Sequence, residues 1–453
     1  MIYHAVRLYR EGALFLAKPL CNIFNSCIFQ RYMPRLWKIA NISPIPKTMP
    51  PNVDALRPVS LLPLPSKLLE RIILERTKTL FIHHIDNDQF AYLPQSSTTC
   101  ALVHLLHRIA LMLDDDNSLG VAVLSLDFSK AFDTISHSKL IKKMIDRGFP
   151  EGLISWTTSY LTERYQRIKL NNVLSSVIEV TSGVPQGSIM GPYLFNFYTS
   201  DLMDELHCSY VKYADDTTLI MQINSDVNSF TTKLVSTFID IQRTSSHNGL
   251  VLNVAKSKLL ICPRTNRCPN LDLPGVQTVD ALKLLGVTLT RNLKWDMHFQ
   301  NVIKKCNQRL YALRVLKPLL HEFELSRVYT CLICSVLSYS SPLFNMLPNK
   351  IIKKVDAFIK RCHRVIHHRE CSCDLTRSFR DLLMSKSVKL FLSAASSQSH
   401  PLHTLIPSRL PRTGHYKVEF SKTLRKQSVF PFNVVGHINS QVVCNSVSNP
   451  LTL

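Results

Sequence analysis

"VKYADDTTLI", residues 211–220, sets two carboxylates side by side in an otherwise apolar and β-branched stretch. The flanking segments "CSYVK" (208–212) and "TTLIMQI" (217–223) have strand composition, so the stretch predicts a β-hairpin with Asp215 and Asp216 near its tip. Like charges this close raise the pKa of one carboxylate unless a cation lies between them. Taken alone, such a pair is equally typical of an ordinary turn.

A third carboxylate follows a run that is typical of a buried strand. Residues Val121–Leu126 are almost continuously apolar, and Asp127 comes next. Taken alone, Asp127 could instead be the N-cap of a helix through "SKAFDTI" (129–135). Carboxylates grouped on buried strands indicate a divalent-cation site. Two Mg²⁺ ions about 3.5–4 Å apart can clamp both oxygens of an in-line phosphoryl displacement, and Mg²⁺ favours one or two carboxylates plus substrate phosphates.

The charge of the chain points to a polyanionic partner. Lys and Arg number 54 against 32 Asp and Glu in 453 residues, a formal net charge of +22. Such an excess favours nucleic acid or an anionic membrane surface, although it could also serve solubility alone. A membrane span is not expected, since no run of 18 uncharged apolar residues occurs. Thirteen scattered Cys and the lack of a signal peptide predict reduced thiols in an intracellular protein.

The rest of the chain alternates helical and extended patterns. Residues 1–33 have an amphipathic helical period, and a proline-dense segment (44–65) predicts extended loop and edge strand around Arg57. A Gly/Pro-rich loop ends at Pro192, which suits the first turn of a helix. Another helix is expected from about Trp295, with Lys304 and Lys305 off its apolar stripe. That basic face could meet solvent or a phosphate backbone.

These segments together resemble the reverse transcriptase of jockey-like non-LTR retrotransposons. "LDFSKAFD" (126–133), "SGVPQGSIMGPYLFNFYTSDL" (182–202) and "YADD" (213–216) resemble polymerase motifs A, B and C. "NGLVLNVAKSKLL" (248–260) is similar to motif D and "LKLLGVTLTRNLKWDMHF" (282–299) to motif E. Upstream, "WKIANISPIPK", "LRPVSLLPLPSKLLERII" and "DQFAYLPQSSTTCALVHL" resemble the fingers segments of that family. The motifs occur in uninterrupted order over about residues 14–370.

The resemblance implies an α+β right-hand polymerase, with a palm whose small antiparallel sheet is backed by helices. The expected divisions are an N-terminal helical extension (1–40), fingers (41–125), a palm carrying motifs A–E and some fingers elements (126–294), a helical thumb (295–370) and a partly disordered C-terminal tail (371–453).

The resemblance also assigns roles to single residues around two metal ions. Asp127 and Asp215 would bridge two Mg²⁺ ions, or Mn²⁺ in their place, with Asp216 as a supporting carboxylate. The Phe128 carbonyl would add an oxygen ligand, and Phe132 would be the steric gate that rejects a 2′-OH, unless it is an ordinary core residue.

Other positions match the nucleotide and primer sites of the family. Gln186 would line the nucleotide pocket, where Gly187 permits close backbone approach. Lys47 and Arg57 would grip the triphosphate, or are two surface cations among many. Lys256 would donate the proton to departing pyrophosphate, with Lys258 as its rival. Gly286 would belong to the primer grip.

The expected activity is RNA-directed DNA synthesis. The partners implied are an RNA template, a DNA primer or target DNA, and dNTPs, in the nucleus or cytoplasm. One rival is an RNA-templated RNA polymerase, against which Phe132 and "YADD" argue; another is a silent relic that only binds nucleic acid. Family members usually carry an upstream endonuclease, so a separate endonuclease and a truncated genomic copy are expected here. The sequence does not indicate an oligomeric state.

One cluster stands outside these motifs. "CHRVIHHRECSC" (362–373) has the composition of a zinc knuckle, but its spacing fits no ordinary tetrahedral site. A thumb helix with incidental Cys and His is the simpler interpretation.

Overall fold

The computed structural model describes residues 2–46, 56–171, 173–206, 208–265, 271–367, 378–411, 415–418, 424–427, 429–431 and 433–440. The chain forms two compact units, each built from several segments. The first contains residues 1–92, 127–206 and 237–253, and the second contains residues 93–126, 207–236 and 254–453. Helix α8 (Val227–His247) contributes residues to both units.

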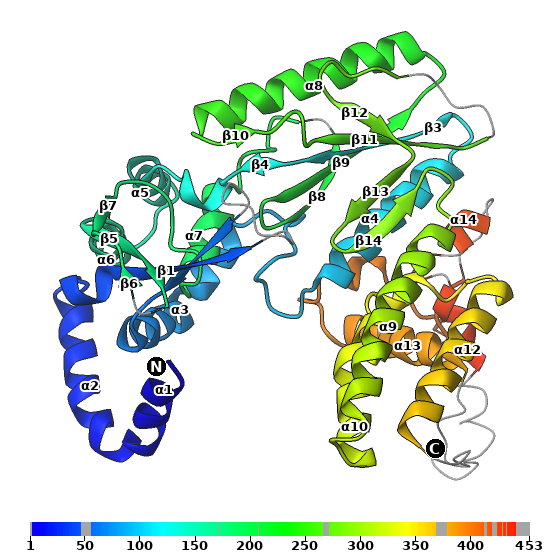
Figure 1. Cartoon of the computed structure of the whole chain (residues 1–453). Coiled ribbons are helices and arrows are strands. Elements are labelled where there is room, and N and C mark those ends of the chain that lie inside the picture. The colour runs from blue at the N-terminus through cyan, green and yellow to red at the C-terminus, as the bar shows by residue number, and fades with distance from the viewer. Residues whose placement is uncertain are drawn as a thin grey trace. The chain divides into compact units, whose positions relative to one another are not determined.

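The first unit combines a mixed sheet with helices (Figure 1). Its sheet has the order β2-β1-β5-β6, with β7 also pairing with β5, and β10 pairs with β4 in a separate ladder. The strands are β1 (Ile39–Pro46), β2 (Leu56–Leu61), β4 (Phe128–Ser129), β5 (Arg164–Leu170), β6 (Val173–Leu174), β7 (Ile178–Val180) and β10 (Val251–Leu252). The helices are α1 (Ile2–Glu11), α2 (Ala13–Phe29), α3 (Leu64–His84), α5 (His137–Asp146), α6 (Glu151–Leu161) and α7 (Gly191–Tyr198), with 3₁₀ turns at Arg35–Lys38 and Ala131–Asp133.

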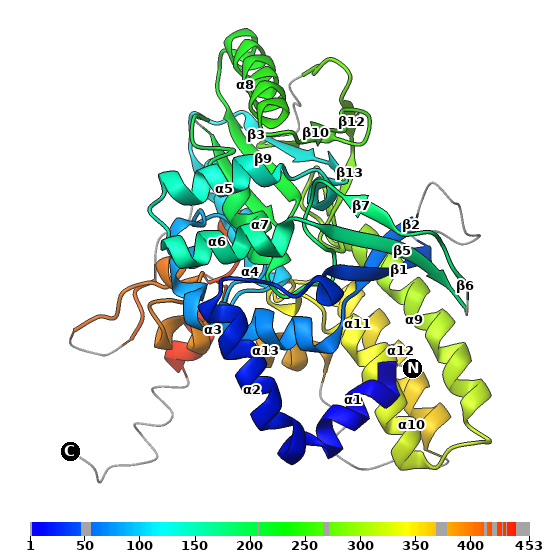
Figure 2. The same ribbon diagram turned by 90° about the vertical axis from the view of Figure 1, so that its left-hand side faces the viewer.

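The proline-dense segment forms the first two strands of the sheet in the first unit. β1 and β2 are antiparallel with Pro44 opposite Pro58, while β1 and β5 are parallel, so the proline-dense segment does form extended structure. Proline lacks the amide donor of a regular ladder, which suits the outer position of β2. Figure 2 shows α5, α6 and α7 grouped beside this sheet. The helices meet around Phe81, Phe149 and Phe197, whose ring centroids lie 4.9–6.0 Å apart.

The second unit contains the run Val121–Leu126, which was predicted to be a buried strand. β3 is the middle strand of a five-stranded sheet of order β12-β11-β3-β9-β8. Val121, Ala122, Val123 and Leu124 in β3 are buried, and α4 packs against β3, β8 and β9. The strands are β3 (Gly120–Leu126), β8 (Ser209–Tyr213), β9 (Asp216–Ile223), β11 (Lys258–Pro263), β12 (Gln277–Val279), β13 (Ala281–Leu284) and β14 (Val287–Thr290).

Helices make up the rest of the second unit. They are α4 (Thr98–Asp114), α9 (Asp296–Leu316), α10 (Glu322–Tyr329), α11 (Ser335–Leu337), α12 (Asn349–Ile366), α13 (Phe379–Ser396) and α14 (Leu424–Gln427), with short helical turns at Thr330–Cys334, Ser341–Leu343 and His403–Leu405. Phe299 on α9, Phe344 and Phe379 pack ring against ring and lie within this core. No helix in the described residues is both long and apolar enough to cross a lipid bilayer.

Candidate active site

The two adjacent carboxylates lie at the tip of a β-hairpin, as predicted. β8 and β9 pair with Tyr213 opposite Asp216, which leaves Ala214 and Asp215 as a two-residue turn. Ala214 has a φ of 57°, a left-handed conformation that is unfavourable for an L-residue with a Cβ. Asp215 is half-buried and Asp216 is exposed. The hairpin therefore holds both carboxylates on a tight, strained turn.

Asp127 follows directly on the central strand of the same sheet. β3 ends at Leu126, which pairs with Thr217, the neighbour of Asp216. The next residue is the half-buried Asp127, after which Phe128 and Ser129 continue as β4. Because a strand and then a 3₁₀ turn follow, Asp127 does not cap an α-helix, and that alternative is wrong.

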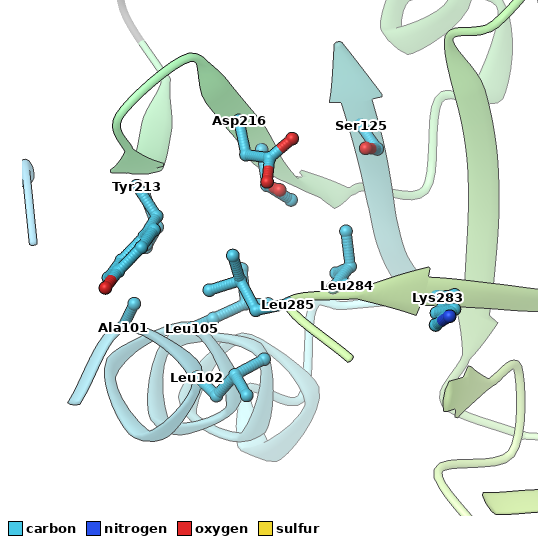
Figure 3. A pocket seen from close by; sticks show the side chains of 11 residues that line it. Ala101, Leu102, Leu105, Ser125, Tyr213, Asp216, Lys283, Leu284 and Leu285 are labelled. Carbon is cyan, nitrogen blue, oxygen red and sulfur yellow. The ribbon is translucent and has the colours of Figure 1, made fainter. Parts of the chain in front are cut away.

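A small cavity of about 60 Å³ opens beside Asp216 within the second unit (Figure 3). Its lining comes from the hairpin, from α4 and from the end of β13, and Asp216, Tyr213 and Leu285 all face it. Burial, and then the neighbouring hydroxyl of Tyr339, raises the pKa of Tyr213, so the phenol is neutral at physiological pH. On this side the carboxylate of Asp216 faces a mixed wall, in which apolar residues of α4 and β13 are joined by Ser125, Thr218 and Lys283.

The segment that carries Lys256 is joined to the segment that follows Asp127. β10 pairs with β4, with Leu252 opposite Phe128, and the Asn253 amide donates a 2.7 Å hydrogen bond to the Asp127 carbonyl. Lys256 lies in the turn after these residues and its side chain is exposed, as is that of Lys258 at the start of β11. Exposure does not distinguish between the two lysines.

Phe132 stands where two loops of the first unit are hydrogen-bonded together. The Val184 amide donates to the Phe132 carbonyl over 2.8 Å, and the Gly183 amide donates to Ile135 over the same distance. A Cβ at Gly183, whose φ is 83°, would come within 2.6 Å of the Asp133 Cα, so only glycine permits this approach. The half-buried Phe132 ring stacks on Phe195 of α7, with ring centroids 4.1 Å apart.

Gln186 is fixed at both its side chain and its backbone. Its amide nitrogen donates a 3.0 Å hydrogen bond to Oδ1 of Asp133, and its carbonyl accepts one of 2.8 Å from the Ser60 amide of β2. Gly187 has a φ of 119°, and a Cβ there would lie 2.8 Å from the Ser60 carbonyl oxygen. Gln186, Asp133 and Lys130 line a cavity of about 500 Å³ in this unit.

Glu70, which no sequence motif marks as functional, supports the loop before α7. This fully buried carboxylate of α3 accepts hydrogen bonds from the Ile189 and Met190 amides, at 2.7 and 3.1 Å, just before α7 begins. Burial raises the pKa of Glu70, against the effect of those amides and of Arg164. The available signal was position, because Glu70 falls on the helical stripe of Ser66, Ile73 and Leu74, which are also buried.

Gly286 occupies a tight turn in the second unit. β13 and β14 pair with Leu284 opposite Val287, and the two turn residues, Leu285 and Gly286, have φ values of 44° and 86°. Two left-handed residues define the type I′ hairpin turn. A cavity of about 280 Å³ next to Gly286 is lined partly by Lys283, Lys304 and Lys305, and its described lining carries no carboxylate. The cavity is therefore electropositive.

Of the two residues expected to bind the triphosphate, Arg57 lies within the described residues and Lys47 does not. Arg57 is exposed on β2, next to Pro58, which lines the same cavity as Gln186. Lys47 lies outside the described residues. The position of Arg57 keeps it a candidate for triphosphate binding, and Lys47 stays a prediction.

The Cys/His cluster is described only in part. Cys362 is buried in α12, and the rings of His363 and His367 are parallel with centroids 6.2 Å apart. His367 Nδ1 lies 3.2 Å from a Glu322 carboxylate oxygen. His368, Cys371 and Cys373 lie outside the described residues.

The oxygen donors of the carboxylate segments suit a hard divalent cation. Within the part of the chain that is described, no three or more His, Cys, Asp or Glu side chains are grouped as a metal cage. Mg²⁺ rarely uses such a cage, because it is held by one or two carboxylates together with substrate phosphates and water. The three aspartates on two strand ends fit that manner of binding.

Comparison with known proteins identifies the family. Residues 45–289 match the family described as reverse transcriptase (RNA-dependent DNA polymerase). The chain is 30% identical over 368 residues to the "RNA-directed DNA polymerase from mobile element jockey" of Drosophila melanogaster, a match that covers 77% of this chain and 39% of that protein. It is 26% identical over 432 residues to the "Probable RNA-directed DNA polymerase from transposon BS" of the same fly, covering 89% and 47%. The chain thus spans less than half the length of these two relatives.

Among solved structures, telomerase of Candida tropicalis with a telomeric RNA fragment aligns with 83% of this chain and 65% of its own, at 10% identity and a TM-score of 0.42.

The family match covers more than half of the chain and includes motifs A to D and part of motif E. With the mixed helices and sheets described above, it confirms the predicted α+β class of a right-hand polymerase. Proteins of this family generally use divalent metal ions. The chain belongs to the reverse transcriptase family of RNA-dependent DNA polymerases.

Proposed function

We propose that this chain is an RNA-directed DNA polymerase of a non-LTR retrotransposon. It joins dNTPs to a primer by attack of the primer 3′-OH on the α-phosphate, with pyrophosphate as the leaving group. The observation that carries the proposal is the shared sheet edge, where β3 runs into Asp127 and the β8–β9 turn holds Asp215 and Asp216. The family match supports it.

Asp127 and Asp215 would hold two Mg²⁺ ions, with Asp216 and the Phe128 carbonyl in support. When bound, the ions would polarise the primer hydroxyl and neutralise the charge on the phosphates. The chain itself supplies a tight turn and a buried strand that fix its carboxylates before the ions arrive. Mn²⁺ has similar oxygen preferences and could replace Mg²⁺.

The nucleotide would lie against the loops that hold Phe132 and Gln186. Stacking on Phe195 fixes the ring plane of Phe132, as a steric gate against a 2′-OH requires. The hydrogen bond to Asp133 fixes the Gln186 amide. Arg57, and Lys47 from the adjoining segment, would bind the triphosphate, and Gly187 brings Ser60 of β2 close to this loop.

Nucleic acid would be bound through positive charge. Lys283, Lys304 and Lys305 surround the cavity beside Gly286, which suits contact with the phosphates of a primer strand. Lys256 would donate the proton to departing pyrophosphate, with Lys258 as the rival. The template would be RNA and the primer DNA, including nicked target DNA from a separate endonuclease.

The expected divisions follow from this proposal. Residues 41–125 would act as fingers, 126–294 as palm and 295–370 as thumb, with residues 1–40 and 371–453 as extensions at either end. The protein would work inside the cell, where dNTPs and RNA templates occur, in the cytoplasm or nucleus.

Primer extension on an RNA template with dNTPs and Mg²⁺ tests the proposal. The protein should extend the primer, and Asp215→Asn should reduce the rate by at least about 10³-fold, while Asp146→Asn, an exposed position on α5, should leave it unchanged. If neither the natural chain nor the Asp146 variant extends a primer, but both bind RNA in a salt-dependent manner, the protein is a nucleic-acid-binding relic.

A further inference from the structure

Tyr339 connects three segments of the second unit that lie far apart in the sequence. Its hydroxyl donates a 2.6 Å hydrogen bond to the Leu285 carbonyl in the β13–β14 turn. The same hydroxyl lies 2.9 Å from the Oγ1 of Thr98 at the start of α4. A Cβ added to Gly286 would lie 3.4 Å from the Tyr339 ring, so the ring packs on this turn as well.

The turn needs such support because its first residue is ill suited to it. A type I′ turn requires a left-handed residue at both central positions, and Asn or Gly normally provides the first. Here Leu285 takes that place with a φ of 44°, a strained conformation for a side chain of its size. A hydrogen bond from outside the turn, to the carbonyl of Leu285 itself, holds the residue in that conformation.

The turn that Tyr339 holds borders two cavities. Leu285 lines the small cavity that Asp216 and Tyr213 face (Figure 3). Gly286 lines the electropositive cavity of Lys283, Lys304 and Lys305. A change in the turn would therefore alter the wall beside the catalytic hairpin and the proposed path of the primer together.

We propose that Tyr339 is a positioning residue for primer binding: its hydroxyl locks the Leu285–Gly286 turn so that the basic cavity receives the primer backbone. This inference rests on the proposed function for the identity of the bound strand. Tyr339 acts through the turn and not by contact with nucleotide or metal. A second contact between the same regions, Thr99 with Ser340 at 3.5 Å, keeps the neighbouring backbone in place.

The first test measures the affinity for a labelled DNA primer annealed to RNA, by fluorescence anisotropy without dNTPs. Tyr339→Phe keeps the ring and removes the hydroxyl, and should weaken binding about 2- to 12-fold, the range expected for one hydrogen bond. Tyr32→Phe is the matched control, because Tyr32 is 39% exposed, close to the 37% of Tyr339, and lines none of the cavities described above. It should bind like the natural protein.

A second comparison separates locking of the turn from a general structural effect. Leu285→Asn puts asparagine, which tolerates left-handed φ, ahead of Gly286 and makes the turn stable by itself. In that background Tyr339→Phe should change the affinity by less than about 1.5-fold, because the hydroxyl no longer has a strained turn to hold. An undiminished loss in the Leu285→Asn background, or no loss in Tyr339→Phe alone, would overturn the inference.

Steady-state extension gives a readout that misfolding would not mimic. Tyr339→Phe should raise the KM for primer–template and leave kcat and the KM for dNTP unchanged. Since the anisotropy assay needs no turnover, a natural protein that binds the duplex but extends nothing would contradict the proposed function and leave the inference about the turn to be decided by binding. A fall in kcat with unchanged primer affinity would contradict the positioning role.

Discussion

The side-chain amide of Gln186 donates a 3.0 Å hydrogen bond to Oδ1 of Asp133, and so connects the loop before α7 to the loop after β4. An amide side chain alone would rotate freely over the cavity that both residues line. The carboxylate of Asp133 fixes which way Gln186 points, and backbone hydrogen bonds hold the two loops around it.

Removal of this acceptor should weaken nucleotide binding. Asp133→Ala frees the Gln186 side chain, and we expect the KM for dNTP to rise about 10-fold, as loss of one polar anchor predicts. Asp133→Asn keeps an acceptor oxygen and should have a smaller effect. The check is steady-state extension at saturating primer, with Asp146→Ala on exposed α5 as control. An equal effect of the alanine and asparagine variants would contradict this role.

Phe132 provides a prediction about sugar selection. Phe132→Ala removes the ring that stacks on Phe195, and rNTP incorporation relative to dNTP should rise on the order of 10- to 100-fold. Competition between dNTP and rNTP in primer extension measures the ratio. Phe195→Ala is an informative companion, because it leaves Phe132 present but unsupported and should relax selection less. An unchanged ratio in Phe132→Ala would favour the core-residue interpretation.

The strained turn before Asp215 predicts an unusual response to glycine. Ala214→Gly relieves the left-handed strain and should keep or raise the free energy of unfolding by up to about 1 kcal/mol. Ala214→Val should lower it by more than about 2 kcal/mol, because a β-branched residue fits neither this φ nor the buried site. Urea denaturation measures both. Ala312→Gly within α9 serves as control and should be destabilising by about 1 kcal/mol.

His298 predicts a pH dependence of stability. This buried side chain accepts a 3.3 Å hydrogen bond from the Thr288 amide at Nδ1, and burial, followed by Lys305, lowers the pKa of His298 to about 4. Between pH 6.5 and 4 the unfolded chain therefore binds a proton that the folded chain does not. As the pH is lowered from 6.5 to 4, the free energy of unfolding should therefore decrease by up to about 3 kcal/mol.

His298→Gln should flatten this dependence, whereas His247→Gln at an exposed position should not. Urea denaturation at several pH values between 4 and 7 makes the comparison. An identical slope in the natural protein and in His298→Gln would show that other groups control acid unfolding.

The sequence was most informative where local pattern decides structure. The hairpin that carries Asp215 and Asp216 and the central strand β3 were predictable. Strand-forming residues flank a polar pair in the hairpin and fill a continuous run in β3. The family resemblance pointed to Gly187 as a position of close backbone approach, and a Cβ there would lie 2.8 Å from the Ser60 carbonyl oxygen. The hairpin and the strand depend on residues that are neighbours in the chain, whereas the partner of Gly187, Ser60, lies in a distant segment and was not predicted.

Contacts between distant segments were beyond such reasoning. Thr98 and Tyr339 are separated by 241 positions, and nothing near either residue indicates that one hydroxyl joins them. Asp133 lies in the segment that resembles motif A but was assigned no role there, and its hydrogen bond to Gln186 depends on how two loops meet. Glu70 carried a positional signal, but a carboxylate among aliphatic residues is more often exposed than buried.

Glu70 also bears on when the contacts of the first unit can form during synthesis of the chain. Its amide partners, Ile189 and Met190, lie 119 and 120 positions further along the chain. At about 5–20 residues per second, roughly 6–24 s of translation separate the carboxylate from the groups that will cover it. Before Met190 is made, the Ser66 hydroxyl on α3 can already pair with Glu70 at 3.1 Å, but the two amides are still missing. The complete set of hydrogen bonds around Glu70 therefore forms only after the loop before α7 has been made, late in the synthesis of the first unit.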